Sequence, residues 1–407
     1  MQLTIARLSL LADGVAHGPE GTVHVAMALP GELVEGTPEG GRIAAPAILT
    51  PSPERVKPPC PHYRSCGGCV LQHASDRFVA GWKAEVVQNA LAQRGIDAPV
   101  SRVETSPAFS RRRATLSGRR TKKGALVGFH ARASDTLVEV EHCRILRPEL
   151  LALRPALAEA TQLGASRKGE MAFALTLSEA GVELAARGGK EMDPALFEAL
   201  AALAHRYDLA RLSWGEETVA ARRPALQAFG AARVNPPPGA FLQATAEGAA
   251  ALSGFVTQAV GPAQRVADLF AGCGTFALPL AAQAEVHAVE GEGAMLAALD
   301  KGWRAAPGLH RVTHELRDLF RRPLLPDEIA RFDAVVIDPP RAGAEAQVAE
   351  IAASNLARLV YVSCNPITFA RDAEKLVAAG FALDELIVVD QFRWSAHVEL
   401  AARFSRA

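Results

Sequence analysis

The second half of the chain alternates short apolar segments with segments of helical spacing, and this alternation restricts the fold more than any other feature. Each of the following lies next to a stretch whose apolar residues recur at helical intervals: RVADLF, EVHAVE, FDAVVID, RLVYVSC and FALDELIVVD. Strands that alternate with helices in this way form a largely parallel sheet with helices on both faces. The sequence therefore predicts a doubly wound, Rossmann-like α/β domain over residues 233–407.

A glycine-rich turn, in RVADLFAGCGTFALPLA, follows the first of these strands. Gly272 and Gly274 permit a tight turn and close approach of a ligand, and the next helix begins with unpaired N–H groups. Glu290 ends the following strand, where an acid usually holds a ribose diol. The turn predicts a nucleotide-like ligand. NAD stays open, because the turn also fits the loose dinucleotide pattern, and close strand-to-helix packing is the structural alternative.

Two polar residues follow buried strands at points where prolines end the strand. They are Asp338 in FDAVVIDPPRAG and Cys364 in RLVYVSCNPITFARD. Ligands of open parallel sheets bind at the carboxyl ends of the strands, so both side chains are expected to face one crevice. Cys364 is then a candidate nucleophile, with a buried structural thiol as the alternative. Asp338 is a candidate ligand-binding residue, with helix capping as the alternative.

The end of the chain contains HVELAARF, which predicts a last strand with His397 and Glu399 on one face. An acid in so apolar a segment is usually paired or functional. Glu399 is therefore a candidate general base, with a solvated edge residue as the alternative.

Half of the six cysteines lie in CPHYRSCGGC, residues 60–69. Cys66 and Cys69, separated by two glycines, can hold one metal centre through a tight turn. A disulfide framework is not expected in a reducing compartment, and the spacing leaves zinc and iron–sulfur open. MQLTIARLSL lacks the basic head and apolar block of a secretion signal, and no uncharged run is long enough for a membrane span, so a cytoplasmic location is expected.

Three further regions precede the α/β domain. Residues 1–52 contain short strand-like runs between Gly and Pro turns, which predicts a small β-barrel. Residues 53–100 hold a Pro-rich linker, the cysteines and a helix ending at Gly95, and residues 101–232 read as a mixed α+β domain. The net charge is zero, so affinity for nucleic acid requires a local patch. RRRATLSGRRTKK is the candidate patch, with a solvated face as the alternative.

Taken together, the motifs resemble those of the RNA 5-methyluridine (uracil-5) methyltransferase family. The matching stretches, in the family's order over nearly the whole chain, are CPHYRSCGGCVLQH, RRRATLSGR, GFH, EHC, FLQ, DLFAGCGTFALPLA, DPPRAG, VYVSCNPITFARD and HVE. The resemblance implies methyl transfer from S-adenosylmethionine to carbon 5 of a uridine, with 23S ribosomal RNA expected ahead of transfer RNA. It also implies a class I methyltransferase domain and a TRAM-type, OB-like barrel that binds RNA. An inactive RNA-binding scaffold and an NAD-dependent oxidoreductase with structural zinc are the alternatives.

The resemblance also assigns roles to single residues. Cys364 is the nucleophile that forms a covalent adduct, and Glu399 is the base. The residues expected around the cofactor and the target base are Gln243, Phe270, Gly272, Gly274, Thr275, Glu290, Asp318 and Asp338. The ligands of a 4Fe-4S cluster with a structural or RNA-orienting role are Cys60, Cys66, Cys69 and Cys143. RNA is the expected partner, without a membrane or an obligate protein partner.

One stretch departs from the family's pattern. Where many members have Phe-Pro-x-Thr before the base, this chain has Phe392, Arg393, Trp394 and Ser395. We expect the choice of target to differ more than the chemistry. The target uridine has to leave its stack, and candidates for stacking on it are Phe241, Phe270 and Trp394, with a place in the core as the alternative.

Overall fold

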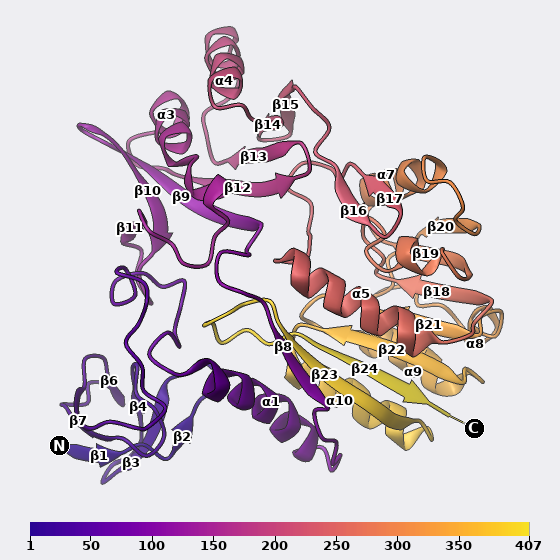
Figure 1. The fold of residues 1–407 in the computed structure, drawn as a ribbon, viewed down its shortest axis with the longest axis horizontal. Helices are drawn as coiled ribbons and strands as arrows, with labels where there is room; N and C mark the ends of the chain where they lie inside the picture. The colour runs from indigo at the N-terminus through magenta and orange to yellow at the C-terminus, as the bar shows by residue number, and fades with distance from the viewer. Residues whose placement is uncertain (407) are drawn as a thin grey trace.

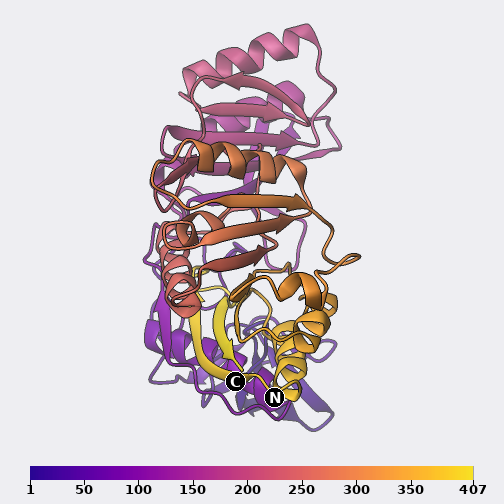
Figure 2. The ribbon, with the colours of Figure 1, turned by 90° about the vertical axis from the view of Figure 1, so that its right-hand side faces the viewer.

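A computed structural model describes residues 1–406 of the chain. In two perpendicular views, the sheet formed by the central region (residues 101–232) lies at the top, and the sheets formed by residues 1–52 lie at the bottom (Figures 1 and 2). Among the helices of these residues, none has the length and apolar character required to cross a membrane.

An eight-stranded sheet carries the predicted α/β domain, which is confirmed. All its neighbouring strands run parallel except those beside β24, which is antiparallel to both neighbours. Its strands, in spatial order, are β20 (Val312–Leu316), β19 (Glu285–Glu290), β18 (Arg265–Leu269), β21 (Ala334–Ile337), β22 (Arg358–Ser363), β24 (Leu400–Ser405), β23 (Ala382–Asp390) and β8 (Arg102–Thr105).

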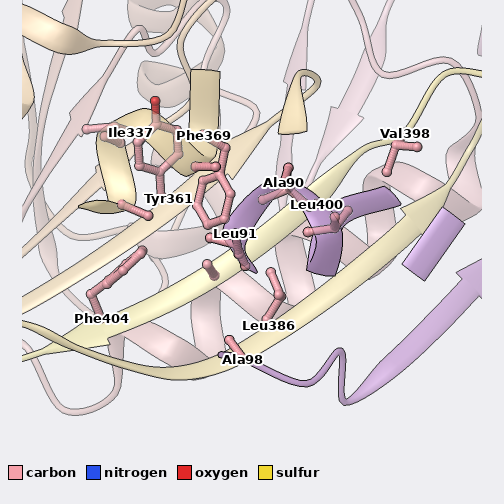
Figure 3. Close-up of a cluster of buried hydrophobic side chains, with 14 of the residues drawn as sticks. Ala90, Leu91, Ala98, Ile337, Tyr361, Phe369, Leu386, Val398, Leu400 and Phe404 are labelled. Atoms are coloured by element: carbon pink, nitrogen blue, oxygen red, sulfur yellow. The ribbon is translucent and has the colours of Figure 1, made fainter. Parts of the chain in front are cut away.

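The two faces of this sheet are covered by different helices because side chains alternate along each strand. Leu359 and Tyr361 of β22 pack with α1 (Asp76–Ala92), α9 (Glu345–Ala353) and α10 (Pro366–Ala378). Figure 3 shows part of this cluster, in which Tyr361 meets Phe369 edge-on at 5.3 Å between ring centroids. Val360 and Val362 of the same strand face α5 (Ala246–Val260) on the other side. The sheet is thus buried on both faces.

Strand β8 is the main departure from the predicted domain boundaries. Residues 101–232 were expected to form one central domain, but Arg102–Thr105 pair in parallel with the end of β23 and close the edge of the eight-stranded sheet. Helix α1, from the cysteine region, also packs on this sheet. Both segments precede the predicted α/β domain in sequence, so its boundary at residue 233 does not coincide with the limits of its core.

The central region forms a seven-stranded sheet with helices on one side. Its strands, in spatial order, are β11 (Leu137–Glu139), β10 (Gly124–His130), β9 (Arg113–Thr121), β12 (Glu170–Ser178), β13 (Gly181–Arg187), β14 (Arg211–Trp214) and β15 (Glu217–Ala221). The helices are α2 (Pro148–Leu151), α3 (Arg154–Gly164) and α4 (Pro194–Arg206). The hairpin of β16 (Gln227–Phe229) and β17 (Ala232–Val234) leads into the α/β domain, whose short helices are α6 (Ala277–Leu280), α7 (Gly293–Arg304) and α8 (Pro326–Ile329).

The N-terminal residues form two small sheets around one core. The first contains β1 (Gln2–Thr4), β5 (Leu33–Glu35) and β7 (Ala47–Thr50), and the second contains β2 (Arg7–Leu8), β3 (Gly14–Gly18), β4 (Gly21–Val25) and β6 (Arg42–Ile43). Buried residues of both sheets, including Leu3, Val25 and Ile43, contact one another. The predicted small β-barrel is therefore not confirmed: these strands form two sheets that share a core.

Candidate active site

Five parallel strands of the large sheet end at one edge and bring the predicted site residues together. Each of the five carries a predicted residue at or just after its carboxyl end: Asp318 after β20, Glu290 on β19, Phe270 after β18, Asp338 after β21 and Cys364 after β22. Since neighbouring parallel strands end on the same side of a sheet, residues far apart in sequence share one surface.

The glycine turn after β18 is joined to the end of β19 by Glu290. The backbone N–H of Gly272 donates to Glu290 Oε2 at 2.9 Å, and Oε1 accepts from the amide of Gly291 at 2.7 Å. Gly274 has φ +93°, and a Cβ there would lie 2.9 Å from Leu278, so packing demands this glycine. Gly272 has φ +55° and open space where its Cβ would be. Of the two glycines, only Gly272 therefore leaves room for a ligand, whereas Gly274 is required for close packing of the turn against the helix that follows.

An aromatic wall stands beside the turn. Phe270 is half-buried, and its ring lies 5.5 Å from that of Phe320, measured between centroids. Asp318 is exposed and accepts the amide of Phe320 at 3.0 Å, while Thr275 is half-buried. The sequence did not point to Phe320, which is exposed and carries no motif. Two aromatic rings at the mouth of the turn suit a flat ligand ring.

Asp268, on β18, is a buried acid that the sequence reading passed over. Its side chain is fully buried, and neither carboxyl oxygen has a hydrogen-bond partner. Burial raises its pKa to about 8, and the nearby Glu290 adds to the rise. An unpartnered buried acid is costly, and here it lies under a turn with open space at Gly272. These features fit a cationic ligand such as S-adenosylmethionine.

Cys364 and Glu399 are brought together by strand register. Strands β22 and β24 are antiparallel, with Ser363 opposite Leu400, so the residue after Ser363 lies beside the residue before Leu400. The prediction that Glu399 and His397 lie within a strand is wrong, because β24 begins at Leu400. His397 instead follows a turn in which its amide donates to Ser395 Oγ at 3.2 Å. The thiol is half-buried and the acid is buried.

The surroundings of this pair favour the uncharged forms of both groups. Burial raises the pKa of Glu399 to about 7, although a hydrogen bond from Gln391 and the charge of Arg113 lower it. Burial raises the pKa of Cys364 to about 11, with Glu399 and Asp338 adding to the rise and Arg341 opposing it. Glu399 is thus poised to take or give a proton near neutral pH, whereas the thiol requires further positive charge to ionise.

Asp338 is a third acid at this edge of the sheet, together with Asp268 and Glu399. Burial raises its pKa well above the usual range, and the charges of Glu399 and Asp268 add to the rise.

Helix α10 begins directly after Cys364, with Asn365 as its N-cap accepting the amide of Ile367 at 3.1 Å and Pro366 in the first turn. Because Asn365 caps the helix, the position of Cys364 is fixed at both ends by regular structure.

Gln391 connects Glu399 to Gln243, and the sequence reading missed it. Its side-chain nitrogen donates to Glu399 Oε2 at 3.1 Å and to Gln243 Oε1, while its side-chain oxygen accepts the amide of Ala244 at 2.7 Å. Gln243, Gln391 and Glu399 are all buried. In the sequence, Gln391 is marked only by lying eight residues before the base, and its segment has no periodicity that would indicate where its side chain points.

A cavity of about 760 Å³ lies where the N-terminal sheets, the cysteine region, the central sheet and the 390–399 segment meet. Its wall includes Phe392 and His397. The arginines that line it are Arg42, Arg111, Arg113, Arg132, Arg144 and Arg341. This basic cavity reaches residues adjoining Glu399 and Cys364, since Arg113 and Arg341 alter the pKa of those two groups.

The basic run predicted to contact phosphates is divided by the fold. Arg111, Arg112 and Arg113 are half-buried, and burial lowers the pKa of Arg113 to about 10. Arg120 is exposed near the β9–β10 turn, together with Lys122 and Lys123. The run therefore presents two separate groups of basic side chains, because β9 begins within it, and contact with phosphates stays a prediction.

The three stacking candidates also differ in exposure. Phe241 is 59% exposed, and the guanidinium carbon of Arg113 lies 4.4 Å from its ring centroid. Trp394 is buried, and its Nε1 donates to Asp76 Oδ1 at 3.1 Å. Trp394 therefore belongs to the core, and Phe241 and Phe270 remain accessible.

The four predicted cluster ligands line the same cavity. They are Cys60, Cys66, Cys69 and Cys143. Burial and the neighbouring thiols raise the pKa of Cys66 and Cys143, and that of Cys69 to about 12. Within residues 1–406, however, no three or more His, Cys, Asp or Glu side chains form a group that could hold a metal ion. The four thiols are thus gathered in one place, and the predicted metal centre is not confirmed.

The chain resembles known proteins along its whole length. Residues 306–406 match the model of the family described as tRNA (uracil-5-)-methyltransferase. An uncharacterized RNA methyltransferase of Brucella suis biovar 1 is 44% identical over 98% of this chain and 97% of its own. The 23S rRNA (uracil(1939)-C(5))-methyltransferase RlmD of Chromohalobacter salexigens is 34% identical over 98% of this chain and 87% of its own.

A solved structure supports the fold. The Pyrococcus abyssi tRNA (uracil-54, C5)-methyltransferase in complex with S-adenosyl-L-homocysteine superposes with a TM-score of 0.74, covering 99% of this chain and 100% of that one. Its sequence is 21% identical, so this likeness bears on the fold alone.

Proposed function

Since this chain belongs to the RNA (uracil-5-)-methyltransferase family, whose members depend on S-adenosylmethionine, we propose that it methylates carbon 5 of a uridine in 23S ribosomal RNA. The observation that carries the proposal is the pairing of a thiol and a buried acid, Cys364 and Glu399, at the carboxyl edge of the sheet. The similarity to RlmD supports ribosomal RNA as the target. Transfer RNA is the second candidate, supported by the description of the matching family.

Methylation of defined RNAs tests this proposal. Purified protein and labelled S-adenosylmethionine would be incubated with unmodified 23S ribosomal RNA and, separately, with unmodified transfer RNA, and 5-methyluridine would be mapped. We expect label at a single uridine of the ribosomal RNA. Label in transfer RNA alone would overturn the proposed target, and absence of 5-methyluridine in both would overturn the proposed activity.

The proposed chemistry begins with the thiol. Carbon 5 of uracil is a poor nucleophile, and addition of the Cys364 thiolate to carbon 6 gives an enolate-like ring whose carbon 5 carries the electron pair. S-adenosylmethionine, when bound, supplies an electrophilic methyl group on a positively charged sulfur, which would also favour the thiolate. Once carbon 5 has bonded to that methyl group and the sulfur has left as a neutral thioether, Glu399 removes the proton from carbon 5, and elimination of the thiolate restores the double bond.

Other residues of the site hold the reactants. Gly272 and Glu290 border the open side of the turn, where Phe270 and Phe320 would flank a flat ring. Burial raises the pKa of Asp268 and Asp338, and a bound cation would favour the charged forms of both acids. Phe241 would stack on an extruded base beside Arg113.

Glu399→Gln tests the role of the base. Because burial raises the pKa of Glu399 to about 7 and that of Cys364 to about 11, the wild-type rate is expected to rise with pH throughout the range from about pH 5.5 to 9, and more steeply below about pH 7 than above it. The amide cannot accept the proton, so Glu399→Gln should lower turnover by about 10²–10⁴-fold and let the RNA adduct accumulate. Rates from about pH 5.5 to 9 and denaturing gels would measure both. A variant with wild-type turnover and pH dependence would exclude this role.

We also propose that the four cysteines hold a 4Fe-4S cluster and that the N-terminal sheets act as a TRAM-type RNA-binding module. Support for the cluster is the gathering of Cys60, Cys66, Cys69 and Cys143 in one cavity with Arg111 nearby. Several irons hold their thiolates farther apart than one ion does, so such a site need not meet the geometry of a single ion. Gly67 also allows close approach, since a Cβ there would lie 2.8 Å from His130 O.

Cys66→Ser tests the cluster. Anaerobically purified wild-type protein is expected to contain iron and to absorb visible light, and removal of one thiolate should strongly reduce both. Cys273→Ser serves as the control, because Cys273 is buried away from the cavity, against Met295. Zinc in place of iron in the wild type, or an unchanged spectrum in Cys66→Ser, would contradict the assignment.

A further inference from the structure

The segment that carries the base, residues 390–399, is held from outside by the cysteine region and helix α1. We call it the base segment. Both Val70 and Leu71, which directly follow Cys69, donate their amides to the carbonyl of Trp394, at 2.8 and 3.0 Å. The carbonyl of Val70 in turn accepts the hydroxyl of Tyr63 at 2.7 Å. The middle of the base segment is thereby tied to the chain that leads into α1.

Asp76, at the start of α1, makes a second attachment. Its Oδ1 accepts Trp394 Nε1 at 3.1 Å, and its Oδ2 forms an ion pair with Arg393. Arg393 also donates to the carbonyl of Ser106 at 3.2 Å. Trp394 has φ +58°, a conformation that a bulky side chain adopts only when its surroundings hold it. Arg393 and Trp394 belong to the stretch that departs from the family's pattern.

Lys83, two turns further along α1, makes a third attachment. Its ammonium lies 2.6 Å from Asp390 Oδ1 and donates to the carbonyl of Phe392 at 3.1 Å. Asp390 Oδ1 also accepts the amide of Phe392 at 3.1 Å. Both charged side chains are fully buried, so solvent does not weaken the pair.

Gln391 lies between these attachments and reaches the base. Its neighbours Asp390 and Phe392 are bound by Lys83, while its own side chain binds Glu399 and Gln243. Movement of the base segment away from α1 would therefore carry Gln391 with it and release the hydrogen bond to Glu399. A displacement of about 1 Å at a catalytic group can cost about a hundredfold in rate.

We propose that Asp76 and Lys83 are positioning residues for Glu399, acting through the base segment and Gln391. The inference rests on the proposed function of Glu399 as the base. Asp76 is the informative position, because its side chain is 57% exposed and its replacement should leave the fold intact. Arg77 is the matched control: it follows Asp76 on the same helix, is 87% exposed, and pairs with Glu54, which is outside the base segment.

The experiment compares Asp76→Ala, Asp76→Asn and Arg77→Ala. Asp76→Ala is expected to lower kcat about tenfold or more while the KM for RNA stays within about twofold, because only the base is misplaced. Asp76→Asn keeps an acceptor for Trp394 Nε1 and should recover part of the loss. Arg77→Ala should behave as wild type. A wild-type kcat in Asp76→Ala, or an equal loss in Arg77→Ala, would overturn the proposal.

Hydrogen exchange separates this proposal from the proposed function. Backbone amides of residues 390–399 should exchange faster in Asp76→Ala than in wild type or Arg77→Ala, and this readout requires no activity. Unchanged exchange would overturn the positioning role even if the enzyme were shown to methylate RNA. Faster exchange in a protein whose wild type methylates no uridine would instead overturn the proposed function alone.

Discussion

Cys364→Ala is expected to lower methylation of RNA by at least about a thousandfold, because without the thiolate carbon 5 of uracil is not activated. Cys364→Ser should lose as much, since a hydroxyl does not ionise near neutral pH. Neither change should unfold the protein, because Cys364 is half-buried and Asn365, not Cys364, caps α10.

Initial rates and trapping would measure this loss. Wild-type protein with 5-fluorouridine RNA and S-adenosylmethionine should form a covalent complex that survives denaturation, and neither variant should form it. Cys273→Ala is the control, since this buried thiol contacts Met295 and should lose at most a few-fold in rate. Residual turnover within about tenfold of wild type in Cys364→Ala would exclude the covalent mechanism.

Lys83→Met is expected to destabilise the protein by about 3–5 kcal/mol, because it leaves the carboxylate of Asp390 buried and unpaired. Burial lowers the pKa of Lys83, and Asp390 opposes that change by favouring the charged amine. The second oxygen of Asp390 has no partner, so the acid depends on Lys83 and the amide of Phe392.

Urea unfolding followed by tryptophan fluorescence would measure this change, since Trp82 lies on α1 and Trp394 in the base segment. The double variant Lys83→Met with Asp390→Leu removes both charges and should be more stable than Lys83→Met alone. A single variant within about 1 kcal/mol of wild type would show that the pair contributes little.

Several features of the site followed from local sequence. Cys364 and Asp338 were found because each follows a buried strand and lies one or two residues before a proline, and such strands end where ligands bind. Gly272 and Glu290 were found in the same way, and the structure joins them by a hydrogen bond. Short-range patterns of this kind depend only on backbone preferences and side-chain alternation, which the chain carries locally.

Other features had no local signal. The run from Arg111 was a candidate phosphate-binding patch, and only the fold shows that Arg111 and Arg113 line the cavity. Trp394 was a stacking candidate, and only the fold shows that its ring is buried and bonded to Asp76, 318 residues earlier in the chain. Strand β8 was likewise predicted to belong to the central domain, but it pairs with β23 and therefore belongs to the eight-stranded sheet.

The sequence by itself determined the α/β fold and the chemistry of the edge, because strand ends, glycine turns and reactive side chains are recorded in neighbouring residues. The tertiary structure alone decided how that chemistry is held in place. Gln391, Lys83 and Asp76 act through contacts between segments distant in sequence, and such contacts depend on how whole elements pack. No periodicity or motif indicates these contacts, because the partner of each side chain lies far away in sequence and comes close only in the folded protein.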